Sequence, residues 1–92
     1  MRRSYPKRGE FWHHFKGNDY CILAVGHHSE TNEEMVVYCR ADGLDKNSSA
    51  ENPCIRPLSM FMSEVDHDKY PTTRQKYRFI RKGNFEPPRV HV

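Results

Sequence analysis

The sequence predicts a mainly β protein: a small five-stranded, SH3-like antiparallel barrel with one short helical turn. A length of 92 residues is enough for one domain and too short for two hydrophobic cores. Short runs of alternating, β-branched or aromatic residues recur between turn-forming residues, and just one brief stretch suits a helix. We expect a single domain over residues 9–82, between a basic N-terminal tail at 1–8 and a C-terminal tail at 83–92.

The first three expected strands have the clearest patterns. Glu10–Phe15 is a short aromatic run that ends at a Lys-Gly-Asn turn. Asp19–His27 carries apolar residues on both faces, which is typical of a strand that is buried on both sides or faces a second surface. Glu34–Arg40 has β-branched and aromatic residues at its centre and follows a polar connector of hairpin length at residues 29–33.

The remaining expected elements are shorter or more polar. Pro53–Arg56 should form a brief strand, and Leu58–Met62 suits one helical turn with Ser59 as its N-cap. Arg74–Arg81 alternates cationic residues with Gln, Tyr and Phe, which predicts a half-buried strand with a cationic outer face.

The hydrophobic core should be thin, because hydrophobic residues make up 36% of the chain. Residues 20–25 and 35–39 should form its centre, and the polar residues 41–52 should form a surface loop. A homo-oligomer would bury more apolar surface than a monomer, and the sequence leaves both states open.

The sequence predicts a cytoplasmic protein. No stretch approaches the roughly 20 apolar residues of a membrane helix, and Met1 is not followed by the apolar core of a signal peptide. Three cysteines, Cys21, Cys39 and Cys54, are an odd number without a paired motif, which favours buried free thiols.

Basic residues are concentrated at the two ends of the chain, around an acidic middle. Residues 1–8 contain four basic residues and no acid, whereas residues 9–73 contain five basic and eleven acidic residues. Five basic residues near the C-terminus could follow a phosphate backbone: Arg74, Lys76, Arg78, Arg81 and Lys82. The competing interpretation is a solvated strand face with solubilising tails.

Four segments carry a resemblance to a known family. They are Phe15-Lys16-Gly17-Asn18 with Tyr20, His28-Ser29-Glu30-Thr31, Val36-Val37-Tyr38, and Arg56-Pro57-Leu58-Ser59-Met60-Phe61. In this order they resemble domain-of-unknown-function family 1653, over about residues 9–65. The resemblance implies a small bacterial or phage β domain and brings no established activity with it. The chain departs from the family pattern at Cys54, where a Trp is typical, and at His27, where an Arg is frequent.

Polar side chains at the expected hairpin tip form the first candidate site. His28, Ser29, Glu30 and Thr31 offer hydrogen-bond donors and acceptors on one exposed turn. Contiguous residues rarely align as a catalytic triad, so ligand contact is the functional interpretation. The structural alternative is a turn in which the hydroxyls of Ser29 and Thr31 bind the backbone.

Arg56 is the expected anchor of the site, because it lies among apolar neighbours and its guanidinium should be partly desolvated. Such a group either pairs with a carboxylate, for which Glu30 is the natural partner, or binds an anionic ligand. Tyr38 or Phe61 would supply a surface on which a ligand could stack, although both fit the core as well.

We therefore expect a non-catalytic module that binds a small anionic, nucleotide-like molecule and uses no cofactor. In a phage such a module could sequester a host signalling nucleotide. RNA or single-stranded DNA binding through residues 74–82 and the tails is the first alternative, and a protein-interaction adaptor is the second. No residue set offers a convincing nucleophile or base, and the His and Cys spacings do not predict a metal site.

Overall fold

The computed structural model describes residues 3–84 and contains five strands and one helical turn. The elements are β1 (Glu10–His14), β2 (Asp19–His27), β3 (Glu34–Arg40), β4 (Cys54–Pro57), α1 (Leu58–Phe61) and β5 (Phe79–Asn84). Their number, type and order agree with the sequence-based prediction.

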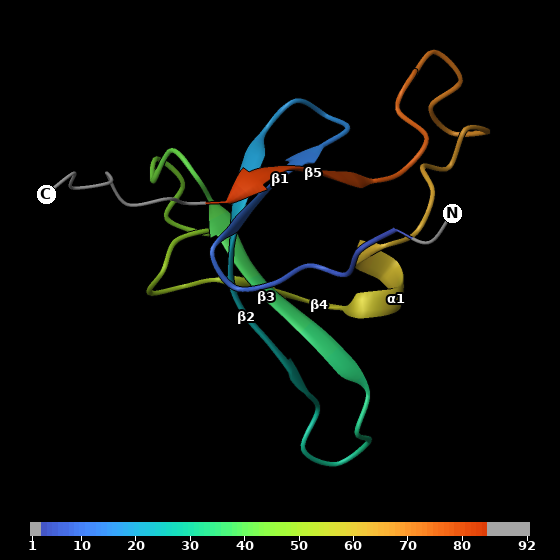
Figure 1. The fold of residues 1–92 in the computed structure, drawn as a ribbon. Coiled ribbons are helices and arrows are strands. Elements are labelled where there is room, and N and C mark those ends of the chain that lie inside the picture. The colour runs from blue at the N-terminus through green and yellow to red at the C-terminus, as the bar shows by residue number, and fades with distance from the viewer. Residues whose placement is uncertain (1–2, 85–92) are drawn as a thin grey trace, which may run out of the picture.

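All five strands belong to one antiparallel sheet with the order β4-β3-β2-β1-β5. The strands β4 and β5 form its two edges, and the sheet bends strongly so that α1 lies near its concave side (Figure 1). Because the sheet is not closed, the barrel expected from the sequence is not confirmed.

Large aromatic side chains fill the concave side of the sheet. Phe61 of α1 stacks on Phe79 of β5 with 4.0 Å between ring centroids, and its edge contacts include Trp12 and Tyr38. The full core cluster is Trp12, Ile22, Val36, Tyr38, Leu58, Phe61 and Phe79. The helical turn thus brings a ring to the space between the two edge strands, where no direct strand pairing exists.

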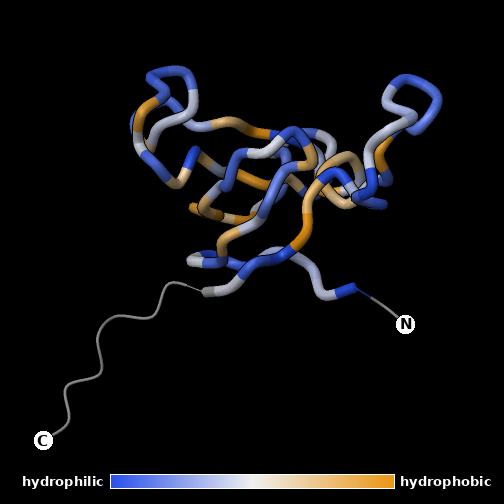
Figure 2. The backbone as a smooth tube through the Cα atoms, turned by 90° about the horizontal axis from the view of Figure 1, so that it is seen from above, coloured by the Kyte–Doolittle hydropathy of each residue, from blue (hydrophilic) through white to orange (hydrophobic). Residues whose placement is uncertain are grey.

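The hairpin of β2 and β3 extends beyond this core as an arm (Figure 1). The hairpin carries buried Ile22, Val36 and Tyr38, whereas Val25, the cross-strand partner of Val36, is 43% exposed. In Figure 2 the protruding loops are mostly hydrophilic and the hydrophobic segments gather between them. The expected centre is therefore correct for residues 35–39 and 20–23, which are buried or half-buried, whereas Ala24 and Val25 are exposed.

The last strand begins later than its alternation predicts. Residues 74–78 precede β5, and Tyr77 instead forms a single bridge to Glu64. The side-chain amide of Gln75 donates to the carbonyls of His13, Tyr77 and Arg78. These side-chain bonds link the segment to β1 in place of a regular ladder.

The prediction of a Ser59 N-cap is wrong. The helical turn begins at Leu58, its N-cap position is Pro57, and no side chain caps it. Pro57 has no backbone N–H and a φ of −55°, which suits the entry into a helix.

Residues 3–8 lie against the domain, although the sequence predicted a tail there. The Arg3 guanidinium donates to the carbonyls of Met62 and Phe79 and lies 3.6 Å from the centroid of the Tyr77 ring. At the other end, β5 extends to Asn84, and the remainder of the predicted C-terminal tail lies outside the described residues.

Candidate functional site

A cavity of about 270 Å³ brings together four cationic side chains that have no carboxylate partner among residues 3–84. We call it the cationic cavity. It is lined by His14, Phe15, Lys16, Arg56, Asp66, Lys69, Tyr70 and Arg78. These residues come from the end of β1 and the β1–β2 turn, from β4, and from the connection between α1 and β5, so three segments far apart in sequence meet there.

Arg56 reaches the cavity from the concave side of the sheet. It pairs with buried Val36 across β3 and β4, and residues paired across strands share a face. Ile55, on the opposite face, is 63% exposed. Arg56 itself is half-buried, as its apolar sequence neighbours predicted.

Tyr38 is a neighbour of Arg56 on the same face of the sheet. Burial raises the pKa of the Tyr38 hydroxyl, and the nearby Arg56 guanidinium, which is hydrogen-bonded to that hydroxyl, opposes the shift. Tyr38 therefore remains protonated at neutral pH, and the charge of Arg56 is not neutralised by it.

Arg78 is held rigidly by its backbone. Its N–H donates to the Ser63 carbonyl at 3.0 Å, and its carbonyl accepts the Phe15 N–H at 3.0 Å. Its guanidinium Nε is buried and has no hydrogen-bond partner; within residues 3–84, Arg40 Nε is the other side-chain atom in that state. A buried donor without an acceptor is costly, so an acceptor supplied by a ligand would be favoured here.

His14 contributes a neutral ring to the cavity. Burial lowers its pKa to about 4, and the positive charges of Arg56, Lys16 and Arg78 act in the same direction. Its Nδ1 accepts the backbone N–H of Lys16 at 3.2 Å, which leaves the proton of the neutral ring on Nε2. At pH 7 His14 is thus a hydrogen-bond donor without charge.

The β1–β2 turn places Lys16 beside the 66–70 turn. Gly17 adopts a φ of +114°, a conformation that favours glycine, and donates to the His14 carbonyl. The Lys16 ammonium lies 5.2 Å from the Tyr70 ring centroid and lowers the pKa of that phenol through a hydrogen bond. Tyr70 also makes an edge contact with Phe15 at 5.0 Å.

Asp66 is the single acidic residue that lines the cavity in the described part of the chain. Its Oδ1 accepts the backbone N–H groups of Asp68 and Lys69, and its carbonyl accepts the N–H of Tyr70. The carboxylate therefore shapes the turn that presents Lys69 and Tyr70. Among residues 3–84, no ion pair joins it to a cation of the cavity.

The hairpin tip expected as part of the site lies elsewhere. Residues 28–33 connect β2 and β3 at the end of the arm, on the opposite side of the molecule from the orange loop after α1 (Figure 1). His28 Nδ1 accepts the backbone N–H groups of Glu30 and Thr31, and the Thr31 hydroxyl accepts the N–H of Glu33. These contacts show turn chemistry in which the His28 ring, rather than Ser29, has the larger part.

The structure shows different surroundings for two further expected contacts, the Glu30–Arg56 ion pair and the stacking surface of Tyr38 or Phe61. No ion pair joins Glu30 to Arg56 in the part of the chain that the structure describes. Phe61 is 0% exposed and Tyr38 is 4% exposed, so neither ring offers a free face for stacking. Of the expected ligand contacts, Arg56 is the one that lines the cationic cavity.

The basic residues of the nucleic-acid alternative are dispersed. Lys82 binds Asp19 at 3.0 Å, Arg81 binds buried Glu10 at 3.1 Å, and Lys76 lies 3.9 Å from Glu64. Arg78 lines the cationic cavity, and Arg74 is exposed. The five residues do not form the single strand face that the alternation predicted, because β5 begins at Phe79.

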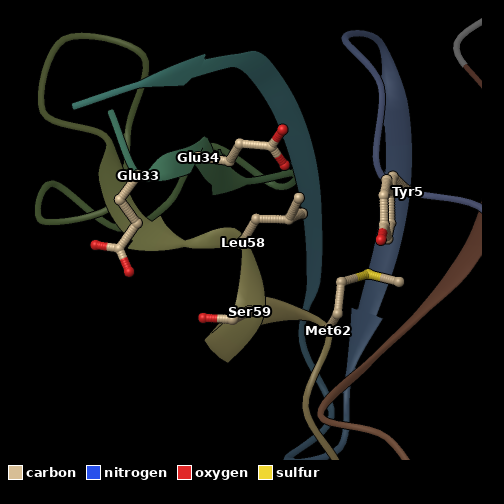
Figure 3. A pocket seen from close by; sticks show the side chains of 6 residues that line it. All are labelled: Tyr5, Glu33, Glu34, Leu58, Ser59 and Met62. Atoms are coloured by element: carbon tan, nitrogen blue, oxygen red, sulfur yellow. The ribbon is translucent and has the colours of Figure 1, made fainter. Parts of the chain in front are cut away.

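A second cavity, of about 390 Å³, has the opposite electrostatic character (Figure 3). Tyr5 and Met62 lie on one side, Glu33 and Glu34 on the other, and Leu58 and Ser59 of α1 lie between them. Among residues 3–84, no basic residue belongs to its lining. This cavity is the larger one, but its carboxylates disfavour an anionic ligand.

Neither a metal centre nor a membrane helix is visible in residues 3–84. No group of three or more His, Cys, Asp or Glu side chains could hold a metal ion there. The helix found in this range is too short to cross a membrane. The cysteines Cys21, Cys39 and Cys54 are free thiols, as their number and spacing predicted, but Cys39 is buried whereas Cys21 and Cys54 are half-buried.

Fold and cavity together define a small open-sheet β domain with a cationic hollow at one end of its concave face. A family model described as protein of unknown function (DUF1653) matches residues 10–81, and the chain belongs to that family. This confirms the resemblance seen in the sequence. No curated protein and no solved structure matches the chain.

Sequence reasoning missed most of the cationic cavity. One usable signal was the alternation in β1, which places His14 on the same face as buried Trp12. Lys69, Tyr70 and Arg78 lie on irregular connections, whose position relative to β4 no periodic pattern could reveal.

Proposed function

We propose that this domain is a non-catalytic module that binds a small anionic, nucleotide-like molecule in the cationic cavity. The observation that carries the proposal is the convergence of Lys16, Arg56, Lys69 and Arg78 on one hollow. None of these four forms an ion pair with a carboxylate among residues 3–84. Clustered cations that lack an internal carboxylate partner favour an external anion.

Each cation has a distinct role in this proposal. Arg56 and Arg78 provide planar guanidinium groups, which bind phosphate or carboxylate oxygens in pairs. Lys16 and Lys69 provide mobile point charges from the exposed side. Phe15 and Tyr70 offer aromatic surface for an attached base or sugar, in place of Tyr38 and Phe61.

No catalytic role is proposed. Neutral His14 has its Nδ1 engaged by the Lys16 N–H, and no serine, threonine or cysteine lines the cavity to act as a nucleophile. In a phage the module would sequester a host nucleotide. Cytoplasmic location and a closed SH3-like barrel stay predictions of the sequence, which leaves the choice between monomer and homo-oligomer open.

The test is calorimetric titration of adenosine monophosphate (AMP) into the unmodified protein and the Arg56→Lys variant. The variant keeps the charge but loses the paired N–H groups, so affinity should fall about tenfold. The melting temperature should change little, because Arg56 holds no ion pair within the described chain.

Arg74→Lys is the matched control, because Arg74 is exposed and lies outside the cavity lining. It should bind AMP as the unmodified protein does. Undiminished affinity of Arg56→Lys would remove Arg56 from the site, and the absence of any AMP binding would overturn the proposed function. Native mass spectrometry of protein from its natural host would complement the titration by reporting stoichiometry and any retained ligand.

A further inference from the structure

The charges and size of the cationic cavity narrow the class of ligand, on the basis of the function proposed above. We infer that the cavity takes a terminal phosphate monoester in its dianionic form, and that it discriminates against phosphodiesters. The attached sugar or base would extend past Phe15 and Tyr70, outside the volume that the cations surround.

Charge balance is the first argument. Lys16, Arg56, Lys69 and Arg78 oppose the single carboxylate of Asp66, so the lining has an excess of three positive charges when His14 is neutral. A monoester dianion offsets more of this excess than a diester monoanion does. The two arginines are half-buried, which makes their interaction with a ligand less screened than that of exposed lysines.

The direction of the contacts is the second argument. The cations reach the cavity from the β1–β2 turn, from β4 and from the α1–β5 connection. A terminal phosphate has three unsubstituted oxygens and can meet donors from several sides. A diester has two such oxygens, and both of its ester arms need a path out of the same hollow.

The cavity volume is the third argument. At about 270 Å³ the cavity is slightly smaller than the roughly 300–1,000 Å³ typical of sites that enclose a whole ligand. It is large enough to hold a phosphate group in direct contact with the lining side chains. A phosphate group held inside the cavity, with the remainder of the ligand outside, fits this size.

The charged and titratable groups around the phosphate set the expected pH dependence. They are His13, His14, Lys16, Arg56, Asp66, Lys69, Tyr70 and Arg78. His14 remains neutral between pH 5.5 and 7.5 in the free protein, because burial and three neighbouring cations lower its pKa to about 4. The second ionisation of the phosphate, near pH 6, should therefore dominate in this range.

The experiment compares AMP, 3′,5′-cyclic AMP and inorganic phosphate by titration at pH 5.5 and 7.5. AMP should bind at least about tenfold more tightly than the cyclic diester at pH 7.5, which corresponds to one charge-assisted contact. Affinity for AMP should rise about fourfold from pH 5.5 to 7.5 as the dianion forms. The affinity for the cyclic diester should stay constant.

The outcomes separate this inference from the proposed function. Equal binding of AMP and cyclic AMP, or AMP binding that strengthens at pH 5.5, would overturn the monoester preference and leave an anion-binding domain. Inorganic phosphate binding as tightly as AMP would support the monoester inference and overturn the nucleotide-like part of the proposal. Failure of all three probes to bind would overturn both.

Arg78→Lys tests the geometry independently of folding. The variant keeps the excess of positive charge but loses the buried Nε donor. Its affinity for AMP should therefore fall more than its affinity for cyclic AMP. Circular dichroism at both pH values establishes that each variant is folded. An equal loss for the two nucleotides would contradict the inference.

Discussion

One carboxylate oxygen of Glu10 accepts both the indole N–H of Trp12 at 3.1 Å and the backbone N–H of Lys7 at 2.8 Å. The other oxygen lies 3.1 Å from Nε of Arg81. Glu10 is 5% exposed, so these donors replace almost all of its water. One buried acid thereby joins the N-terminal segment, the core and β5.

Glu10→Gln should lower the free energy of unfolding by about 2 kcal/mol, because it removes a charge-assisted acceptor from buried donors. Glu64→Gln is the matched control: its exposed carboxylate lies 3.9 Å from Lys76, and its loss should cost less than about 0.5 kcal/mol. Urea denaturation of both variants measures the difference. Equal stabilities would show that Glu10 has no special structural role.

Phe61→Ala should destabilise the domain by about 3–5 kcal/mol, the usual cost of removing a buried ring. The ring is 0% exposed and stacks on Phe79, and it fills the space between the two sheet edges. Many small domains have little more stability than this in total, so the variant is expected to be largely unfolded at 37 °C.

Phe61→Leu separates packing from ligand contact. It retains apolar volume and should leave a folded protein whose AMP affinity is unchanged, because Phe61 does not line the cationic cavity. Thermal melting and calorimetric titration at low temperature measure the two effects. A weakened affinity in a fully folded variant would place Phe61 in the site, as the sequence first suggested.

The stability of the domain should fall between pH 6.5 and 4 through His14. Its folded pKa is lowered to about 4 by burial and by Arg56, Lys16 and Arg78, whereas the unfolded value is near 6.5. In this window the unfolded chain binds the proton that the folded ring excludes, so acid favours unfolding. Because the ring is partly exposed, we expect a loss of about 1–2 kcal/mol after allowance for solvent screening.

His14→Gln should flatten that part of the pH profile. Urea midpoints at pH 5 and 7 give the comparison, and His67→Gln, an exposed substitution, is the control. If stability depends on pH equally in His14→Gln and in the unmodified protein, another group causes the acid sensitivity.

Local pattern was sufficient for the elements whose partners are close in sequence. Asp19–His27 and Glu34–Arg40 were predicted with the bounds that the structure shows, because two runs of apolar, β-branched and aromatic residues around a short polar connector define a hairpin without distant information. The start of β5 was predicted too early, because its pairing with β1 decides where the strand begins. Before that point, the side chain of Gln75 holds the segment by hydrogen bonds to the backbone carbonyls of His13 and Arg78.

The candidate site was less accessible to sequence reasoning for the same reason. Apolar neighbours identified Arg56 as half-buried, but its companions Lys69, Tyr70 and Arg78 are brought to it by an irregular connection. The polar residues 28–31 were chosen as the site instead. Polar side chains at a hairpin tip can contact a ligand, but they can equally stabilise the turn itself, and here they do so.

Cys21 and Cys39 should react slowly with iodoacetamide in the folded protein. They face each other as cross-strand neighbours in β2 and β3, and burial raises the pKa of both thiols. The thiolate is the reactive form, so a raised pKa reduces the rate at neutral pH. Mass spectrometry should show faster labelling of both cysteines after unfolding in urea; equal rates in the two states would contradict this assignment.

Oligonucleotide binding should show little dependence on salt. A protein that neutralises several phosphates releases a counterion for each, so its affinity falls steeply as salt rises. Here Lys82 and Arg81 are engaged by Asp19 and Glu10, and Arg78 lines a cavity rather than a continuous strand face. We therefore expect the logarithmic salt slope for a single-stranded oligonucleotide to be about one or less.

Fluorescence anisotropy from low to physiological salt measures this slope, and two double variants identify its origin. Arg74→Ala with Lys76→Ala removes exposed charges outside the cationic cavity, and Arg56→Lys with Arg78→Lys alters the cavity while keeping its charge. If the oligonucleotide is held only by a terminal phosphate, the second pair weakens binding and the first does not. A slope near three that the first pair abolishes would instead support the nucleic-acid alternative, because it would show that several phosphates contact the 74–82 segment at once.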